Sequence, residues 1–173
     1  MSRELIVYPD KRLRQKSARV VKFDDGLGAL LEDMNLAMIE HNGVGLAAIQ
    51  IGEPLRAFVV NIANEEGERL PENLMEFINP EIVKAEEEIL WNEGCLSIPE
   101  FTEEVIRFTK ITLKYQDRRG KPFVIEAEGL LAIAFQHEID HLDGKLFVDR
   151  LPLLKRKKFE KEWKKNLKAN AKP

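Results

Sequence analysis

The strongest constraint on the fold is a segment near the C-terminus that is apolar on every side before it becomes strongly polar. Residues 130–135 read Leu-Leu-Ala-Ile-Ala-Phe, and residues 137–141 then read His-Glu-Ile-Asp-His. The spacing predicts a helix from about 130 to 142 that ends before Gly144. A helix that is apolar all round belongs inside a protein. We therefore expect a buried helix that carries ionisable side chains into the interior.

Composition excludes several classes of protein. A chain of 173 residues, 44% of them hydrophobic, is the size of one globular domain with a real core. Its single cysteine excludes a disulfide-based scaffold and the common zinc-finger ligand sets. The apolar runs are too short to span a membrane, and residues 1–5 lack the pattern of a signal peptide. We expect a soluble cytoplasmic protein without a membrane partner.

Charge is distributed unevenly along the chain. Residues 152–173 hold nine of the 27 basic residues and two of the 30 acidic ones, a local net charge of +7 that leaves −10 for the remainder. An acidic body repels phosphate, so specific DNA binding is not expected. The sequence predicts a domain at 1–152 and a basic helical extension at 153–173, which is either a solvent-exposed helix or a segment with its own partner.

Periodicity predicts the other elements. Residues 24–41 have apolar side chains at helical spacing, with Asp24 or Asp25 as the N-cap, whereas residues 1–23 are expected to be mostly irregular. Residues 104–128 alternate as a hairpin around a turn at 117–120. We also predict a strand at 57–62, a loop at 63–73, two short strands within 74–91, and a final helix at 153–170.

The polar half of the buried helix has the pattern of a metal site. His137 and His141 are four residues apart on one helical face, and Glu138 lies beside them. In hydrolases with this pattern, the metal lowers the pKa of a water molecule and the glutamate moves the proton. The alternative is a pair of core histidines satisfied by hydrogen bonds. Candidates for a third ligand are Cys95, His41 and several carboxylates; a lone cysteine is often only a small buried hydrophobe, but the histidine pair favours Cys95.

Residues 43–50, Gly-Val-Gly-Leu-Ala-Ala-Ile-Gln, form a further candidate segment. Two glycines on either side of Val44 suggest a backbone that another group approaches closely. The simpler interpretation is a helix end followed by a tight turn. Gln50 follows an apolar run, so we expect its amide to be buried and to require a partner.

Together these segments resemble a known family. Gly43-x-Gly45-Leu46-Ala47-Ala48-x-Gln50, Glu93-Gly94-Cys95-Leu96-Ser97 and Gln136-His137-Glu138-x-Asp140-His141 resemble the three motifs of the peptide deformylases, in the same order. The resemblance covers about residues 3–155. It implies an α+β fold with antiparallel or mixed β-sheets around a central helix. It also implies removal of the formyl group from the N-terminal formylmethionine of nascent bacterial or organellar polypeptides, with release of formate.

The resemblance also implies roles for particular residues. Cys95, His137 and His141 match the metal ligands, for Fe²⁺ in the native enzyme, with Zn²⁺, Ni²⁺ or Co²⁺ able to replace it. Glu138 matches the general base, while Gln50 and the backbone N–H of Leu96 match the groups that stabilise the oxyanion.

Substrate binding follows from the same motifs. The backbone of Gly43, Val44 and Gly45 would pair with an extended N-formylmethionyl peptide, and Glu93 and Gly94 belong to the motif beside it. The methionine pocket is expected to contain the His137 ring and the side chains of Val44, Trp91, Leu130, Ile133 and Ala134.

Several residues near these motifs suit more than one role. Trp91 stands where a smaller aliphatic residue is usual, and Leu130 and Ile133 suit a plain core role equally well. Arg107 and Asp140 are expected to form an ion pair behind the metal, with Asp140 turned away from it. His41 is expected to be a surface residue at a helix end, where its charge suits the helix dipole.

Two other functions share parts of the pattern. A metallopeptidase that cleaves internal peptide bonds also uses His-Glu-x-x-His, but Cys95 and Gln50 argue against it. An inactive ribosome-binding homologue would be expected to have lost Glu138, Cys95 or Gln50. The resemblance also supports docking of the basic tail on the ribosome, whose surface is rich in phosphate; the alternative is a solubilising helix packed lightly on the domain.

Overall fold

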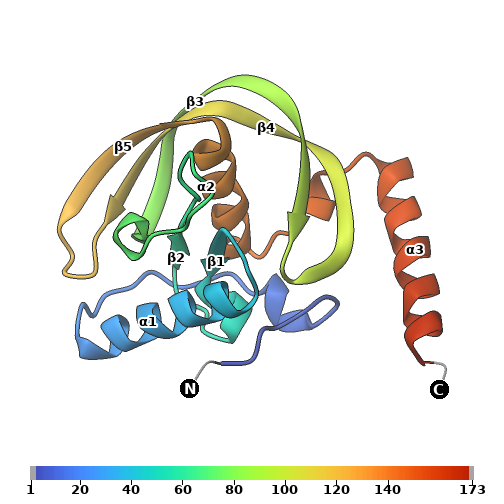
Figure 1. The fold of residues 1–173 in the computed structure, drawn as a ribbon, viewed down its shortest axis with the longest axis horizontal. Coiled ribbons are helices and arrows are strands. Elements are labelled where there is room, and N and C mark those ends of the chain that lie inside the picture. The colour runs from blue at the N-terminus through green and yellow to red at the C-terminus, as the bar shows by residue number, and fades with distance from the viewer. Residues whose placement is uncertain (1–2, 172–173) are drawn as a thin grey trace.

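A computed structural model describes the backbone of residues 3–171 and the side chains of residues 3–169. This part of the chain forms an α+β fold, as expected, with one five-stranded antiparallel sheet in the order β1-β2-β3-β4-β5 (Figure 1). The strands are β1 (Gly45–Ala47), β2 (Ala57–Val60), β3 (Met75–Cys95), β4 (Ile98–Gln116) and β5 (Pro122–Glu128). The α-helices are α1 (Asp25–Glu40), α2 (Gly129–Leu142) and α3 (Leu153–Ala171). Short 3-10 helices are η1 (Lys11–Arg14), η2 (Ala48–Ile51), η3 (Pro71–Asn73) and η4 (Phe147–Arg150).

Strand β2, which lies between β1 and β3, separates two parts of the core. Successive side chains of a strand point to opposite faces of the sheet. Ala57 and Val59 accordingly belong to the cluster that includes the apolar side of α1. Phe58 and Val60 belong to the cluster that includes the apolar residues of α2. Because all four positions are completely buried, β2 reads as an unbroken apolar run in the sequence.

Helix α2 lies inside the molecule, as its apolar first half predicts. Ten of its fourteen residues are buried, including Glu138, Asp140 and His141. It lies beneath the curved β3–β4 hairpin and packs against β1, β2, β4 and β5 (Figure 1). The ionisable side chains of α2 are therefore largely shielded from bulk water, and burying such groups is costly unless they are paired.

The β3–β4 hairpin differs from the expectation of two short strands within 74–91. That prediction was wrong, because residues 75–95 form a single strand. The strand is irregular near its start: Asn79 has a positive φ of 49°, and the register with β4 shifts between Ile78 and Lys84. These bulges bend the strand without ending it, since β4 supplies paired backbone along most of its length.

Several local predictions are confirmed and others need correction. The Asp24 side chain accepts a hydrogen bond from Leu27 N at 3.1 Å and caps α1. The predicted turn after β4 is present, with Gly120 at φ 86°. The expected strand at 57–62 ends two residues earlier, and residues 43–50 contain strand β1 and helix η2 rather than only a turn.

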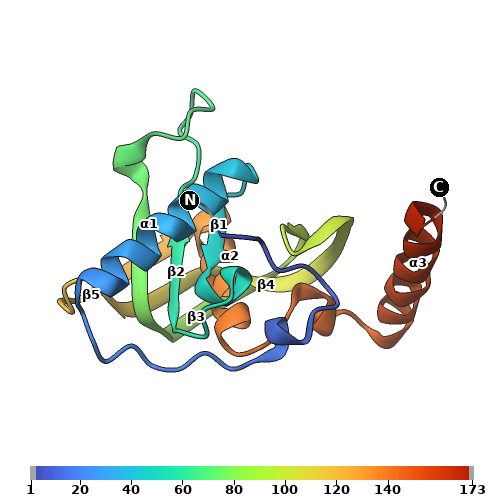
Figure 2. The same cartoon turned by 90° about the horizontal axis from the view of Figure 1, so that it is seen from below.

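Helix α3 projects from the side of the domain (Figure 2). Phe159 is its only buried residue among residues 153–169. The Phe159 ring packs against Tyr8 and Phe101, with centroids 5.3 and 4.5 Å apart, and Trp163 meets Tyr8 edge to face. No helix within residues 3–171 has the length and apolar character needed to cross a membrane.

Candidate metal centre and active site

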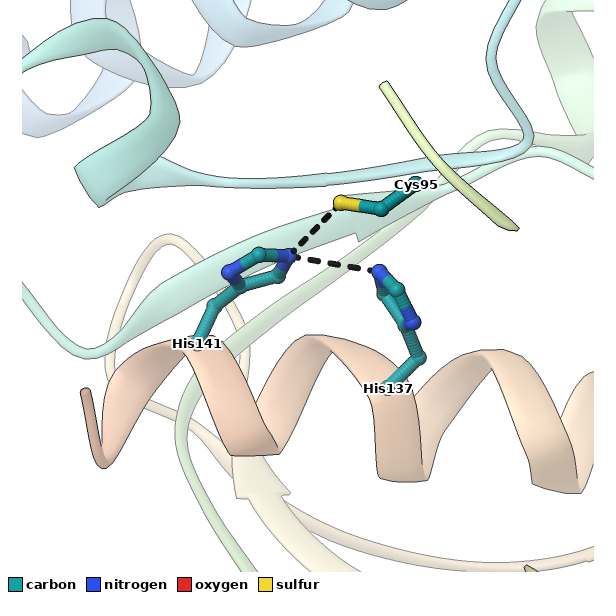
Figure 3. A group of neighbouring side chains, drawn as sticks. All are labelled: Cys95, His137 and His141. Carbon is teal, nitrogen blue, oxygen red and sulfur yellow. Dashed lines mark hydrogen bonds between the residues drawn. The ribbon is translucent and has the colours of Figure 1, made fainter. Parts of the chain in front are cut away.

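Three potential metal ligands meet between α2 and the end of β3. His137 and His141 project from the same face of α2. Cys95, the last residue of β3, points its side chain toward them (Figure 3). The two Nε2 atoms are 3.2 Å apart, and Cys95 Sγ is 3.4 Å from Nε2 of His141. All three donor atoms lie within 4.8 Å of one another. The structure therefore gathers the three residues that the sequence motifs singled out.

The donor atoms fit a transition-metal ion. In a tetrahedral site with bonds of the usual length, two nitrogens are about 3.3 Å apart and a nitrogen and a sulfur about 3.6 Å. The observed separations of 3.2 and 3.4 Å are close to both values. One thiolate with two imidazoles suits Fe²⁺, Zn²⁺, Ni²⁺ or Co²⁺ better than Mg²⁺ or Ca²⁺, which prefer oxygen ligands. Three protein ligands also leave a position open for a reactant.

A buried carboxylate orients the first of these histidines. Glu93 Oε1 accepts a short hydrogen bond from Nδ1 of His137, which leaves Nε2 directed toward the metal site. Arg107 binds the same carboxylate through two contacts of 2.6 and 2.8 Å. Burial alone would raise the pKa of Glu93, but the hydrogen bonds from Arg107 and His137 outweigh it and lower the pKa to about 2. Glu93 is therefore a permanent anion behind His137.

Asp140 continues this network from α2 through Arg107. Arg107 Nη1 donates to Asp140 Oδ2 at 2.7 Å, which confirms the ion pair expected from the sequence. Arg150 adds two contacts of 2.6 and 2.7 Å to the same carboxylate. Burial would raise the pKa of Asp140, but the two arginines keep that pKa below its usual value. The Arg150 contact was missed, because nothing in the spacing connects η4 to α2.

Glu138 lies beside the metal ligands in a different environment. Its side chain is buried, and Oε1 is 3.8 Å from Nε2 of His137. Among the described residues, Oε2 has no hydrogen-bond partner. Burial raises the pKa of Glu138 to about 7, so this carboxyl group can both accept and release a proton near neutral pH.

Gly45 makes room for Glu138. A Cβ atom at Gly45 would lie 3.3 Å from both Cγ and Cδ of Glu138, which is closer than ordinary packing allows. A Cβ at Gly43 would lie 2.4 Å from Cδ1 of Leu96. Close approach of other groups, which the two glycines suggested in the sequence, is therefore the reason that both positions lack a side chain.

Gln50 is held rigidly next to Cys95. Its side chain is 1% exposed, and its carbonyl oxygen accepts a hydrogen bond from Ala47 N at 2.9 Å. Its Nε2 donates to Ser97 Oγ at 3.0 Å and lies 3.9 Å from Cys95 Sγ. Ser97 donates in turn to the Ile6 carbonyl at 2.7 Å. This confirms the buried, partnered amide expected from the sequence and directs an N–H donor toward the site.

The site opens into a cleft of about 1070 Å³. Every residue predicted to bind substrate lines this cleft, together with Cys95, His137, Glu138, Gln50 and Leu96. The predicted set is Gly43, Val44, Gly45, Trp91, Glu93, Gly94, Leu130, Ile133 and Ala134.

Other parts of the wall were not foreseen. Leu5 and Val7 come from the N-terminal segment, and Phe101 comes from β4. His41 is exposed at the end of α1, as expected, but it also lines the cleft, which the sequence did not indicate. These residues belong to none of the three sequence motifs. Only the tertiary fold brings them to the cleft, so local sequence patterns could not reveal them.

The chain matches proteins of known family over nearly its whole length. Residues 2–157 match the family described as Polypeptide deformylase. A peptide deformylase of Wolinella succinogenes is 55% identical over 96% of this chain and 98% of the relative. One from Campylobacter jejuni is 52% identical over 99% of both chains. The crystal structure of a peptide deformylase from Legionella pneumophila superposes with a TM-score of 0.87 at 44% identity, and both chains are covered completely.

An α+β fold whose buried helix brings two histidines and a glutamate to a cysteine defines a hydrolase of the metal-dependent type. The matches above identify the family within this class. This chain belongs to the polypeptide deformylase family. It is a hydrolase that acts on amides and removes the formyl group from the N-terminus of nascent polypeptides.

Proposed function

We propose that this chain hydrolyses the formyl group of N-formylmethionyl peptides in the cleft between α2, β1 and β3, with one divalent ion held by Cys95, His137 and His141. The observation that carries the proposal is the convergence of these three donor atoms beside the buried Glu138. Fe²⁺ is the proposed native metal, and Zn²⁺, Ni²⁺ or Co²⁺ would occupy the same ligands. The bound ion would polarise the formyl carbonyl and lower the pKa of the attacking water.

Glu138 is the proposed proton carrier. It removes a proton from the attacking water and returns that proton to the amine nitrogen as the bond to the formyl carbon breaks. A raised pKa of about 7 suits both steps, because near neutral pH the carboxyl group of Glu138 can then act both as a base and as an acid. The unpartnered Oε2, together with the snug fit against Gly45, supports a carboxylate that is poised for a reactant.

Gln50 and the backbone N–H of Leu96 are the proposed oxyanion donors. Gln50 is suited to this role because Ala47 and Ser97 fix its amide before the substrate arrives. A fixed donor of this kind typically lowers the activation barrier by about 3–4 kcal/mol. Leu96 follows Cys95 directly, and its side chain rests against Gly43, so its peptide is held near the same point.

The methionine side chain would enter the apolar part of the cleft. Val44, Trp91, Leu130, Ile133 and Ala134 supply that wall. The peptide beyond the methionine would lie along β1, which is an edge strand of the sheet among the described residues. An edge strand offers unpaired backbone groups to an extended peptide, which supports pairing with Gly43, Val44 and Gly45.

The basic helix α3 is the proposed ribosome-docking element of a bacterial cytoplasmic enzyme. Its lysines at positions 157, 158, 161, 164, 165 and 168 are all exposed. Formylated chains emerge from ribosomes, and a cluster of lysines is attracted to the phosphates of ribosomal RNA. The similarity to peptide deformylases of bacteria supports the proposal of a bacterial cytoplasmic enzyme. The alternative is a helix that serves only solubility.

One assay tests the central proposal. Release of formate from a formyl-Met tripeptide is measured under anaerobic conditions, and the metal content of the same sample is determined. We expect turnover in proportion to bound metal, at up to one ion per chain. An active sample without metal would refute the proposed centre. Equal cleavage of an unformylated peptide would point instead to a metallopeptidase.

A further inference from the structure

An unbroken chain of hydrogen bonds connects the ligand His137 with the surface residue Arg150. Nδ1 of His137 binds Glu93, and Glu93 binds Arg107 through two contacts of 2.6 and 2.8 Å. Arg107 reaches Asp140 at 2.7 Å, and Asp140 receives two bonds of 2.6 and 2.7 Å from Arg150. Every link is therefore of normal or short length for a charge-assisted hydrogen bond.

The network is electrically balanced only when Arg150 is included. Its two carboxylates, Glu93 and Asp140, are 6% and 7% exposed at their side chains. Arg107, at 1% exposure, is the single cation between them and divides its donors between the two. Arg150 supplies the second positive charge. Buried charges require such pairing, because water cannot stabilise them there.

Arg150 holds this place from outside the core. Its side chain is 42% exposed, whereas the three inner members of the network are almost fully buried. It stands at the end of η4, whose residues Phe147 and Val148 are buried in the neighbouring core cluster. The guanidinium plane binds both oxygens of Asp140, which a lysine ammonium cannot do.

We propose that Arg150 is a positioning residue for the metal centre, a role that rests on the function proposed above. By satisfying Asp140, it allows Arg107 to remain engaged with Glu93, which in turn fixes the ring of His137. Asp140 directly precedes His141 on α2, so the same contact also holds the turn that carries the second histidine. Without Arg150, Arg107 is drawn toward Asp140 and the orientation of both histidines loosens.

The test uses the Co²⁺-loaded enzyme, whose visible spectrum reports the coordination geometry. Arg150→Met is expected to alter the Co²⁺ absorption bands and to speed release of Co²⁺ to a chelator by about tenfold, in line with other contacts that support metal ligands. Arg150→Lys keeps the charge but loses the two-point contact, so its release rate should lie between those of Arg150→Met and the parent. A parental spectrum and parental release rate in Arg150→Met would overturn the proposal.

Charge balance supplies a sharper test. Asp140→Asn removes one negative charge, so the double variant Asp140→Asn with Arg150→Met is again neutral. It should regain slow Co²⁺ release relative to Arg150→Met alone. If Arg150→Met does not fold, Arg150→Lys is compared with the double variant Asp140→Asn/Arg150→Lys. This comparison tests the same charge balance, because the double variant has one surplus positive charge in the network. Absence of any coupling between the two positions would overturn the proposal.

A matched control separates this role from general stability. Arg14 forms an ion pair with Asp149 in the same helix η4 but has no contact with Asp140. Arg14→Met should therefore loosen η4 equally while leaving the Co²⁺ spectrum unchanged; an equal effect on the spectrum would overturn the specific role of Arg150. If the parent enzyme does not give the spectrum of a cobalt–thiolate centre, the metal site itself is refuted. That outcome is distinguishable from failure of the Arg150 role, which concerns only the difference between parent and variant.

Discussion

Helices α2 and α3 show two opposite uses of charged side chains. Both carry several ionisable residues, yet α2 lies beneath the sheet while α3 stands at the side of the domain. In α2, each carboxylate has a specific environment: Asp140 is paired with two arginines, whereas Oε2 of the buried Glu138 has no hydrogen-bond partner among the described residues. In α3, every lysine but Lys155 is exposed, and Lys155 is the only one of them that makes an ion pair within residues 3–169, with Glu103.

The comparison shows that burial, together with the charges of the neighbouring groups, gives an ionisable residue its chemical role. Burial raises the pKa of Glu138 to about 7, while the buried Glu93 is held at about 2 by its cationic neighbours. On the exposed surface, water and salt screen each charge and weaken its interaction with its neighbours. Substitutions in and around α2 should therefore alter chemistry, whereas substitutions of the α3 lysines should alter only association.

The largest expected effect is on α2 itself. Glu138→Ala should lower kcat by about 10³-fold or more, because it removes the proton carrier. It should leave metal content unchanged, because Glu138 is not among the three ligands. His141→Ala is the informative counterpart, since it should lose both metal and turnover. Near-normal kcat in Glu138→Ala would show that the proposed mechanism is wrong.

A second prediction concerns Phe159, the one buried residue among positions 153–169 of α3. Phe159→Ala removes a ring that packs against Tyr8 and Phe101, and should lower the free energy of unfolding by about 3–5 kcal/mol. Leu167→Ala, at a half-exposed position of the same helix, should change it by less than about 0.5 kcal/mol. Denaturant unfolding measures both. Similar values for the two variants would mean that the start of α3 is not part of the core.

The methionine pocket gives an intermediate effect. A formyl-Ala peptide lacks about three buried groups of the methionine side chain, each contributing about 0.8 kcal/mol. We expect kcat/KM for the formyl-Met peptide to be greater by about 30- to 60-fold. Parallel assays with the two peptides measure the ratio. A ratio near one would remove Val44, Leu130 and Ile133 from the assigned pocket.

Gly45 provides a smaller and more local test. Gly45→Ala places a methyl group 3.3 Å from Glu138, which must shift by a few tenths of an ångström, so kcat should fall by about tenfold. Gly28→Ala is the matched control, because its methyl group would meet only Arg118 Nη1 at 3.6 Å. Steady-state kinetics of both variants decide the matter. Equal kcat values for the two would argue against tight packing around the base.

The smallest effect on catalysis is expected from the lysines of α3. Combined Lys164→Glu, Lys165→Glu and Lys168→Glu should change turnover of a free formyl-Met peptide by less than about twofold, because these side chains are exposed and surface charges contribute little. Ribosome binding should weaken, and binding of the parent should fall steeply with salt. If both proteins bind ribosomes equally at low salt, α3 is only a solvent-exposed helix.

Sequence patterns predicted those features that depend on local spacing. His137 and His141 lie four residues apart on a helix, so their shared face follows from helical geometry alone. The apolar residues around them indicated that this helix is buried. Cys95 was harder to place, because its approach to α2 depends on the path of β3; the histidine pair favoured it as the third ligand, and the family resemblance supported that choice.

Features that depend on long-range pairing were not predictable in the same way. Residues 74–91 contain turn-like signals at Asn79 and Pro80, yet they belong to a single strand, because β4 pairs with them and tolerates the irregularity. The contact of Arg150 with Asp140 likewise requires the chain to turn back after α2. Such contacts are set by tertiary structure, which local spacing does not contain.

X-ray absorption at the edge of the bound metal tests the central claim most directly. The sample is the anaerobically purified enzyme, with Cys95→Ser as its partner. The claim predicts one sulfur at about 2.3 Å and two imidazole nitrogens at about 2.0–2.1 Å in the parent. The sulfur signal should be absent from Cys95→Ser. A parent spectrum with only oxygen and nitrogen neighbours, or a sulfur signal that persists in Cys95→Ser, would contradict the proposed centre.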